Sequence, residues 1–282
     1  MEWTILSDQY VLLVAVLVLI VGMIIYQAIR KDKQHINPVL DIGEGSSIGN
    51  KESQEDAGGA AEAAWGTLTV LADGVGKEQA GKIAALTTVR MFIKLFTSYN
   101  VTSNVSHFFT QAFNQSNMEV LERLQGAKGK VAAGAVLVNK GHLYYASVGD
   151  IHIAILRNRE LIAINDGHTM QSTATKGFSA GLLSREQALA ISKIHRHTNY
   201  IGRDGFKNIE IGHEAITLHT GDKIILMNQG IYKSLSWLEL EAILHQSYSC
   251  QQLAEQIIAK FNLKTMPDKG NASLFVLRYN EV

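Results

Sequence analysis

Residues 67–85 read TLTVLADGVGKEQAGKIAA and are the most informative stretch of the chain. Residues 67–71 are β-branched or apolar, which predicts a buried strand. Ala72-Asp73-Gly74 predicts a turn that ends this strand, and apolar residues at helical spacing predict a helix over roughly residues 78–99. An aspartate between a buried strand and a glycine-rich helix start can offer a carboxylate and a bare carbonyl to a hard cation. An isolated Asp-Gly turn, however, is far more often just a turn.

The chain after this stretch alternates runs of strands with runs of helices. Apolar runs bounded by turn residues predict strands at residues 131–138, 143–148, 151–156 and 274–279. Helical spacing and two capping boxes, Ser184 to Gln187 and Ser236 to Glu239, predict helices near residues 107–124, 185–193, 237–247 and 251–261. This order favours an α+β layered domain rather than a parallel βαβ fold.

The N-terminal region predicts a single membrane span. Residues 11–29 are apolar and carry no charged side chain, a length that suits a hydrocarbon core of roughly 30 Å. Arg30, Lys31 and Lys33 follow the span and no basic residue precedes it, so the positive-inside rule places the C-terminal part in the cytosol. We therefore expect a single-pass protein of the cell membrane, in contact with the lipid bilayer through residues 11–29.

Four segments follow from this reading. Residues 1–10 are expected to be a short extracytoplasmic segment, 11–29 the transmembrane helix, 30–40 a juxtamembrane linker and 41–282 one soluble domain. The single cysteine, Cys250, excludes an internal disulfide framework and agrees with a cytosolic domain. The 26 basic and 26 acidic residues balance, and no basic stripe indicates a nucleic-acid partner.

Five short motifs occur in an order that characterises a known family. They are Gly49, Lys51, Gln54, Glu55 and Asp56; Asp73 to Ala84; Gly149-Asp150; Gly221-Asp222 followed by an apolar run to Gly230; and Gly270 to Ser273. In these motifs the chain resembles the metal-dependent serine/threonine phosphatases of the protein phosphatase 2C (PPM) family. The resemblance covers residues 41–282 and implies a β-sandwich of two sheets flanked by helix pairs.

The resemblance also implies a metal site, of which this chain keeps only a part. In the family, four aspartates bind two Mn²⁺ or Mg²⁺ ions that activate a water for attack on a phosphoserine or phosphothreonine. Asp56 and Asp73 match two of the four, Gly74 can lend its carbonyl, and Glu55 matches a neighbouring acid. Gln229 and Gly270 stand at the third and fourth positions. Lys51 stands where the family has an arginine and is a candidate for phosphate contact.

The two departures weaken the expected metal site. Two unit charges about 4 Å apart interact by roughly 4 kcal/mol at an effective dielectric of 20, so the loss of one carboxylate ligand lowers metal affinity by about a thousandfold. Gln229 offers a neutral oxygen and Gly270 offers no side chain. We therefore expect at most one Mn²⁺ or Mg²⁺ ion, held by Asp56 and Asp73.

These observations favour a membrane-anchored pseudophosphatase or regulatory binding subunit in phospho-signalling. Its partner would be a phosphoprotein or a kinase-linked membrane complex. A divergent but active Mn²⁺- or Mg²⁺-dependent phosphatase acting on membrane-proximal phosphoproteins is the first alternative. A structural subunit of a membrane assembly is the second, although the predicted span has no Gly-x-x-x-Gly face for helix contacts.

Overall fold

The computed structural model describes residues 39–168, 170–192 and 198–280. Apart from Val39, these residues lie in one compact unit, Leu40–Glu281. Within the described ranges no helix is both long enough and apolar enough to cross a membrane. The predicted span at residues 11–29 lies outside these ranges.

The first of two sheets joins strands from both ends of the unit. Its order is β1-β11-β10-β6-β7, and every neighbouring pair is antiparallel. The strands are β1 (Leu40–Ser47), β6 (His152–Arg157), β7 (Glu160–Ala163), β10 (Lys223–Met227) and β11 (Ala272–Tyr279). β11 lies between β1 and β10 and is buried along almost its whole length, which explains its unbroken apolar run.

The second sheet is also antiparallel and has the order β2-β3-β4-β5-β8, with β9 paired to β5. Its strands are β2 (Ala57–Ala63), β3 (Gly66–Gly76), β4 (Gly129–Asn139), β5 (His142–Val148), β8 (Glu210–Ile211) and β9 (Ile216–Thr217). β4 is the most buried of them because helices cover one of its faces and the first sheet covers the other. The two antiparallel sheets with helices confirm the predicted α+β fold.

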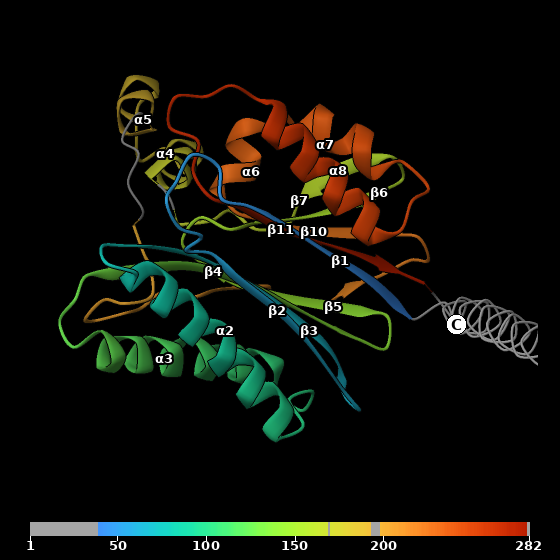
Figure 1. The fold of residues 1–282 in the computed structure, drawn as a ribbon, viewed down its shortest axis with the longest axis horizontal. Helices are drawn as coiled ribbons and strands as arrows, with labels where there is room; N and C mark the ends of the chain where they lie inside the picture. The colour runs from blue at the N-terminus through green and yellow to red at the C-terminus, as the bar shows by residue number, and fades with distance from the viewer. Residues whose placement is uncertain (1–38, 169, 193–197, 281–282) are drawn as a thin grey trace, which may run out of the picture. The chain divides into compact units, whose positions relative to one another are not determined.

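Helices cover the outer faces of the sandwich (Figure 1). α2 (Ala80–Ser98) and α3 (Val105–Leu124) pack on the second sheet, while α6 (Gln229–Ser234), α7 (Trp237–Leu244) and α8 (Cys250–Leu263) pack on the first. α4 (Met170–Ser179) and α5 (Arg185–Ser192) form a pair at one end of the molecule. A third apolar cluster fills the space between the sheets and includes Leu71, Val136 and Phe275.

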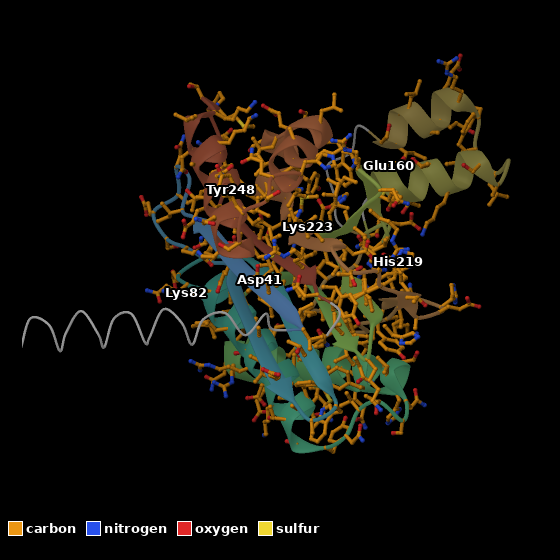
Figure 2. All side chains as sticks on the ribbon, turned by 90° about the vertical axis from the view of Figure 1, so that its right-hand side faces the viewer. Asp41, Lys82, Glu160, His219, Lys223 and Tyr248 are labelled. Atoms are coloured by element: carbon orange, nitrogen blue, oxygen red, sulfur yellow. The ribbon has the colours of Figure 1, made fainter. Side chains whose placement is uncertain are left out.

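The strand register separates the two ends of the sandwich. At one end, Ser47 lies beside Ala272 in the first sheet and Ala57 lies beside Ala72 in the second. We call this the loop end, because the connections after β1, β3 and β10 lie there (Figure 1). The opposite end contains the start of β1 at Asp41, and Figure 2 looks onto it.

The predicted turn at Ala72-Asp73-Gly74 is wrong. β3 continues to Gly76, because Asp73 pairs with Ala132 and Gly74 pairs with Val131 of β4. Asp73 therefore projects from a strand. β1 and β2 were not predicted either, since their glycine- and alanine-rich sequences carry little strand preference without their neighbours.

Helix ends follow local side-chain chemistry. Both predicted capping boxes are present, with reciprocal hydrogen bonds between Ser184 and Gln187 and between Ser236 and Glu239. A third box, Ser249 with Gln252, begins α8 and was not predicted. Such caps satisfy backbone N–H groups that a helix start leaves without partners.

We expect Phe113→Ala to destabilise the fold strongly, because Phe113 is fully buried and its ring lies 4.9 Å from that of Phe92. Removing such a side chain costs about 3–5 kcal/mol. Met118→Ala on the same helix should change stability by less than about 0.5 kcal/mol, because Met118 is 64% exposed. Urea unfolding followed by circular dichroism measures both values. Equal midpoints for the two variants would contradict the packing described for α3.

Candidate functional site

Two predicted ligand residues meet at the loop end, joined by an amide that was not predicted. Asp56 precedes β2 and Asp73 lies within β3. The side-chain Nδ2 of Asn228 donates to Asp56 Oδ2 at 3.0 Å, to Asp73 Oδ2 at 3.2 Å and to the backbone carbonyl of Asn271 at 3.1 Å. The amide therefore lies between the two carboxylates and holds both with its hydrogens.

The remaining contacts of Asn228 fix this amide in place. Asn228 is fully buried and caps α6, and its Oδ1 accepts hydrogen bonds from the backbone N–H groups of Ile231 and Ser273. The Ser273 hydroxyl donates to Asp56 Oδ2 at 2.6 Å. An asparagine directly before a helix is a recognisable N-cap signal, and that signal could have located this residue from the sequence.

Gly74 lies at a very close approach of three backbone segments. A Cβ atom at Gly74 would stand 2.2 Å from the carbonyl oxygen of Gly81 and 2.6 Å from that of Glu55. Only glycine fits there. Close packing therefore explains Gly74 whether or not its carbonyl ever contacts a cation.

Burial raises the pKa of both bridged carboxyl groups. The pKa of Asp56 rises from an ordinary 3.8 to about 6, mainly because burial disfavours the charged form, while the Ser273 hydroxyl opposes the rise. The pKa of Asp73 is raised well above its ordinary value, first by burial and then by the charges of Asp56 and Asp150. Ionising both acids together is therefore costly, and proton uptake by the pair is favoured.

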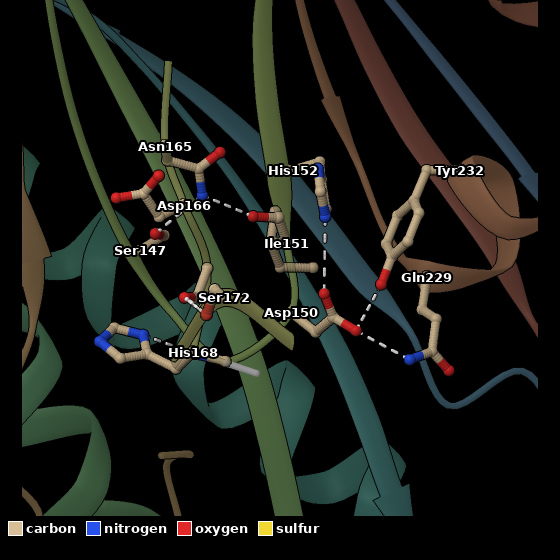
Figure 3. Close-up of polar contacts among 12 residues, drawn as sticks. Ser147, Asp150, Ile151, His152, Asn165, Asp166, His168, Ser172, Gln229 and Tyr232 are labelled. Carbon is tan, nitrogen blue, oxygen red and sulfur yellow. Dashed lines mark hydrogen bonds and ion pairs between the residues drawn. The ribbon is translucent and has the colours of Figure 1, made fainter. Parts of the chain in front are cut away.

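A third carboxylate, Asp150, was noted in a sequence motif but was not assigned to the site. It is buried beside the β6 start, and its Oδ2 accepts from Gln229 Nε2 at 2.8 Å and from the Tyr232 hydroxyl at 2.5 Å (Figure 3). His152 Nε2 lies 3.6 Å from the other oxygen. Burial alone would raise the pKa of Asp150, but the contacts from His152, Tyr232 and Gln229 outweigh it and lower the pKa to about 2.

The other predicted site residues lie around these three aspartates. Glu55 is held near the loop by its backbone N–H, which donates to Asn271 Oδ1, and burial raises its pKa against the charge of Lys51. Lys51 is exposed on the β1–β2 loop. Gln229 directs its amide nitrogen to Asp150, and Gly270 lies in a position where an added Cβ would meet nothing within 4 Å.

These residues do not fit a two-ion centre. Among the described residues, no group of three or more histidine, cysteine, aspartate or glutamate side chains is arranged to hold a metal ion. A hard cation needs oxygen lone pairs, whereas Asn228 points N–H groups at both carboxylates. One observation favours a single ion: Asp56 Oδ1 is buried without a hydrogen-bond partner.

We expect Asp56→Asn to remove part of the pH dependence of stability. The folded-state pKa of about 6 exceeds the ordinary value of 3.8, so the folded state binds more protons in this range and the free energy of unfolding falls as pH rises from about 4 to about 6. At about 1.4 kcal/mol per pKa unit, this fall is at most about 3 kcal/mol. Urea unfolding across this pH range in EDTA measures it, with the exposed Asp204→Asn as control. An unchanged slope in Asp56→Asn would contradict the assignment.

Comparisons with known proteins find a matching family model and similar curated proteins. The family model described as protein phosphatase 2C matches residues 44–174. The protein phosphatase PhpP of Streptococcus pneumoniae is 24% identical over 199 residues, which cover 68% of this chain and 78% of that protein.

Solved structures share the fold. The serine/threonine phosphatase of S. agalactiae superposes with a TM-score of 0.75 at 22% identity, over 86% of this chain and all of that one (100%). The catalytic domain of the serine/threonine phosphatase PstP, solved with 2 manganese ions, has a TM-score of 0.68 at 19% identity, over 86% of this chain and 99% of that one. The family model matches less than half of this chain and the solved structures are less than 25% identical to it, so the comparisons show a shared fold and a partial match to the protein phosphatase 2C model.

Proposed function

We propose that this protein is a pseudophosphatase, a phosphatase-like domain that recognises a phosphorylated partner and does not turn it over by two-metal hydrolysis. The bridging amide of Asn228 carries this proposal. Two-metal hydrolysis depends on anionic oxygens that hold both ions and lower the pKa of a bound water. Here an amide donates to one oxygen of each of the two matching aspartates, and the other two ligand positions are Gln229 and Gly270.

The same site supports binding of at most one Mn²⁺ or Mg²⁺ ion. Asp56 has one unpartnered buried oxygen, and Asp73 lies within hydrogen-bonding distance of the same amide. An ion there would compete with the Asn228 hydrogen bonds, so its binding is expected to be weak.

A divergent active phosphatase is the second candidate. It is favoured by the proximity of Asp56 and Asp73 and by relatives that carry the name of serine/threonine phosphatases. This candidate requires that ion binding displaces the Asn228 amide from both carboxylates. The phosphatase assay below separates the two candidates.

A membrane anchor at residues 11–29 remains part of the proposal, with the compact unit in the cytoplasm. β1 has 8 residues and spans about 26 Å, from the end shown in Figure 2 to the loop end. An anchor that precedes Leu40 would therefore join the unit at the end opposite to Asp56 and Asp73. The partner of the loop end would be a phosphoprotein or a kinase-linked membrane complex.

We expect the full chain, purified in mild detergent with Mn²⁺, to hydrolyse neither a phosphothreonine peptide nor an aryl phosphate. The physical reason is the absence of anionic ligands at positions 229 and 270. Phosphate release measures turnover, and calorimetric titration with Mn²⁺ measures the number of ions bound. Robust turnover that disappears in Asp73→Asn would instead establish the active phosphatase.

The double variant Gln229→Asp with Gly270→Asp tests whether the missing anionic ligands at these two positions limit ion binding. Gly270 has open space for a side chain, so the aspartate fits without displacing neighbours. Mn²⁺ affinity is expected to rise by at least about a thousandfold, since one restored charge alone contributes roughly 4 kcal/mol. No gain in Mn²⁺ affinity would show that Gln229 and Gly270 are not what limits ion binding.

We expect the full chain to sediment with membranes and to resist extraction by alkaline carbonate. Deletion of residues 1–29 should release it, because the hydrophobic run supplies the membrane affinity. Fractionation followed by immunoblotting measures both forms. A full chain found in the soluble fraction would contradict the anchor.

A further inference from the structure

We propose that Lys130 and Arg203, which both contact the ring of Tyr200, form an anion subsite at the loop end that binds the phosphate group of a phosphorylated peptide segment. The inference rests on the proposed function, because it names the place where a phosphorylated partner is held. It concerns a surface beside the aspartates rather than the aspartates themselves.

The strand register places Lys130 next to the candidate site. Lys130 of β4 pairs with Val75 of β3, and Ala132 pairs with Asp73. Cross-strand partners lie on one face of a sheet, so Asp73, Val75 and Lys130 share a face. Diagonal neighbours of this kind have Cα atoms about 7–8 Å apart. Lys130 is exposed and therefore lies at the solvent-facing edge of the face that carries Asp73, and we call this edge the rim.

A second cation, Arg203, lies near this rim because Lys130 and Arg203 both lie near the ring of Tyr200. Lys130 Nζ lies 4.9 Å from the centre of the Tyr200 ring, and Arg203 Cζ lies 5.5 Å from it. Neither cation forms an ion pair with a carboxylate of the described residues, although the exposed Asp204 follows Arg203 in sequence. Both cations lie near the same ring, so an anion that contacts both would offset their mutual repulsion.

Hydrogen bonds from a buried side chain hold the backbone at Arg203 in this position. The side chain of Asn117, buried in α3, accepts from the N–H groups of Gly202 and Arg203 and donates to the carbonyl of Arg203. Ile201 exchanges two backbone hydrogen bonds with Val131 at the start of β4. The backbone that carries Arg203 is thus prearranged, which lowers the entropic cost of binding a ligand.

Electrostatics favours this rim over the aspartates as the place for a phosphate. The buried carboxyl group of Asp150, which lies near Asp73, would repel a phosphate dianion. Lys130 and Arg203 offer charge-assisted hydrogen bonds of the kind that phosphates prefer. Val75, which is 57% exposed beside Lys130, offers an apolar contact to a side chain next to the phosphorylated residue. A phosphorylated peptide can contact both the two cations and Val75, whereas free phosphate can contact only the cations.

The test measures the affinity of the full chain for a short fluorescein-labelled peptide with one phosphothreonine, by fluorescence anisotropy in EDTA. The unphosphorylated twin should bind at least about tenfold more weakly, and Lys130→Glu and Arg203→Glu should each weaken phosphopeptide binding by about tenfold or more. Rising salt should weaken the binding as well. Lys140→Glu is the matched control, because Lys140 is exposed at the other end of β4 and should leave the affinity unchanged.

Several outcomes would overturn the subsite. One is equal affinity for the phosphorylated and the unphosphorylated peptide, and another is a loss of affinity in Lys140→Glu as large as in Lys130→Glu. A third is binding to anionic vesicles that Lys130→Glu abolishes while the affinity for the phosphopeptide is unchanged. Melting curves of each variant show whether a loss of binding reflects unfolding, and Arg203→Lys, which keeps the charge, should retain most of the affinity. Turnover with Mn²⁺ is measured separately on the same preparation. Turnover would contradict the pseudophosphatase proposal. It would not contradict the subsite if Lys130→Glu and Arg203→Glu still weaken phosphopeptide binding in EDTA.

Discussion

The carboxylates of Asp56, Asp73 and Asp150 meet at one end of the sandwich, and their mutual repulsion has to be offset for the fold to close there. Asn228 and Ser273 donate hydrogen bonds to the first pair, and Gln229 and Tyr232 donate to Asp150. These donors come from the start of α6, its N-cap residue included, and from the start of β11. The hydrogen bonds that stabilise the buried carboxylates therefore also join the two sheets at the loop end. Burial is the main cause of the raised pKa of Asp73, and the charges of Asp56 and Asp150 raise it further.

This arrangement has consequences for function. A phosphatase of this fold that uses two ions would need lone pairs directed at the ions, whereas this chain directs side-chain N–H and O–H groups at its aspartates. The three aspartates lie at the loop end, and the cations near the Tyr200 ring lie at the rim beside them. Such a pattern suits recognition of a phosphorylated segment by its outer contacts more than it suits attack on the phosphorus.

The strongly patterned elements could be predicted from the sequence, and the weakly patterned ones could not. α2, α3 and β4 carry clear periodicity or long apolar runs, because each is buried against the core over most of its length. β1 and β2 consist largely of small residues, and pairing with β11 and β3 makes them strands. The extension of β3 through Asp73 likewise depends on β4, since the local Asp-Gly pattern favours a turn. Local chemistry did predict the capping boxes, whose partners are three residues apart.

The sequence by itself determined which chemical groups this protein has: the apolar run at residues 11–29, Asp56 and Asp73, and the neutral residues Gln229 and Gly270. It also determined the order of motifs that resembles the protein phosphatase 2C family. Only the tertiary structure decided which groups meet. Asn228 reaches Asp56 and Asp73 across long separations in the chain, and Lys130 meets Arg203 through Tyr200. The physical reason is that such contacts depend on sheet register and side-chain direction, which arise only when distant strands pair and the core is packed.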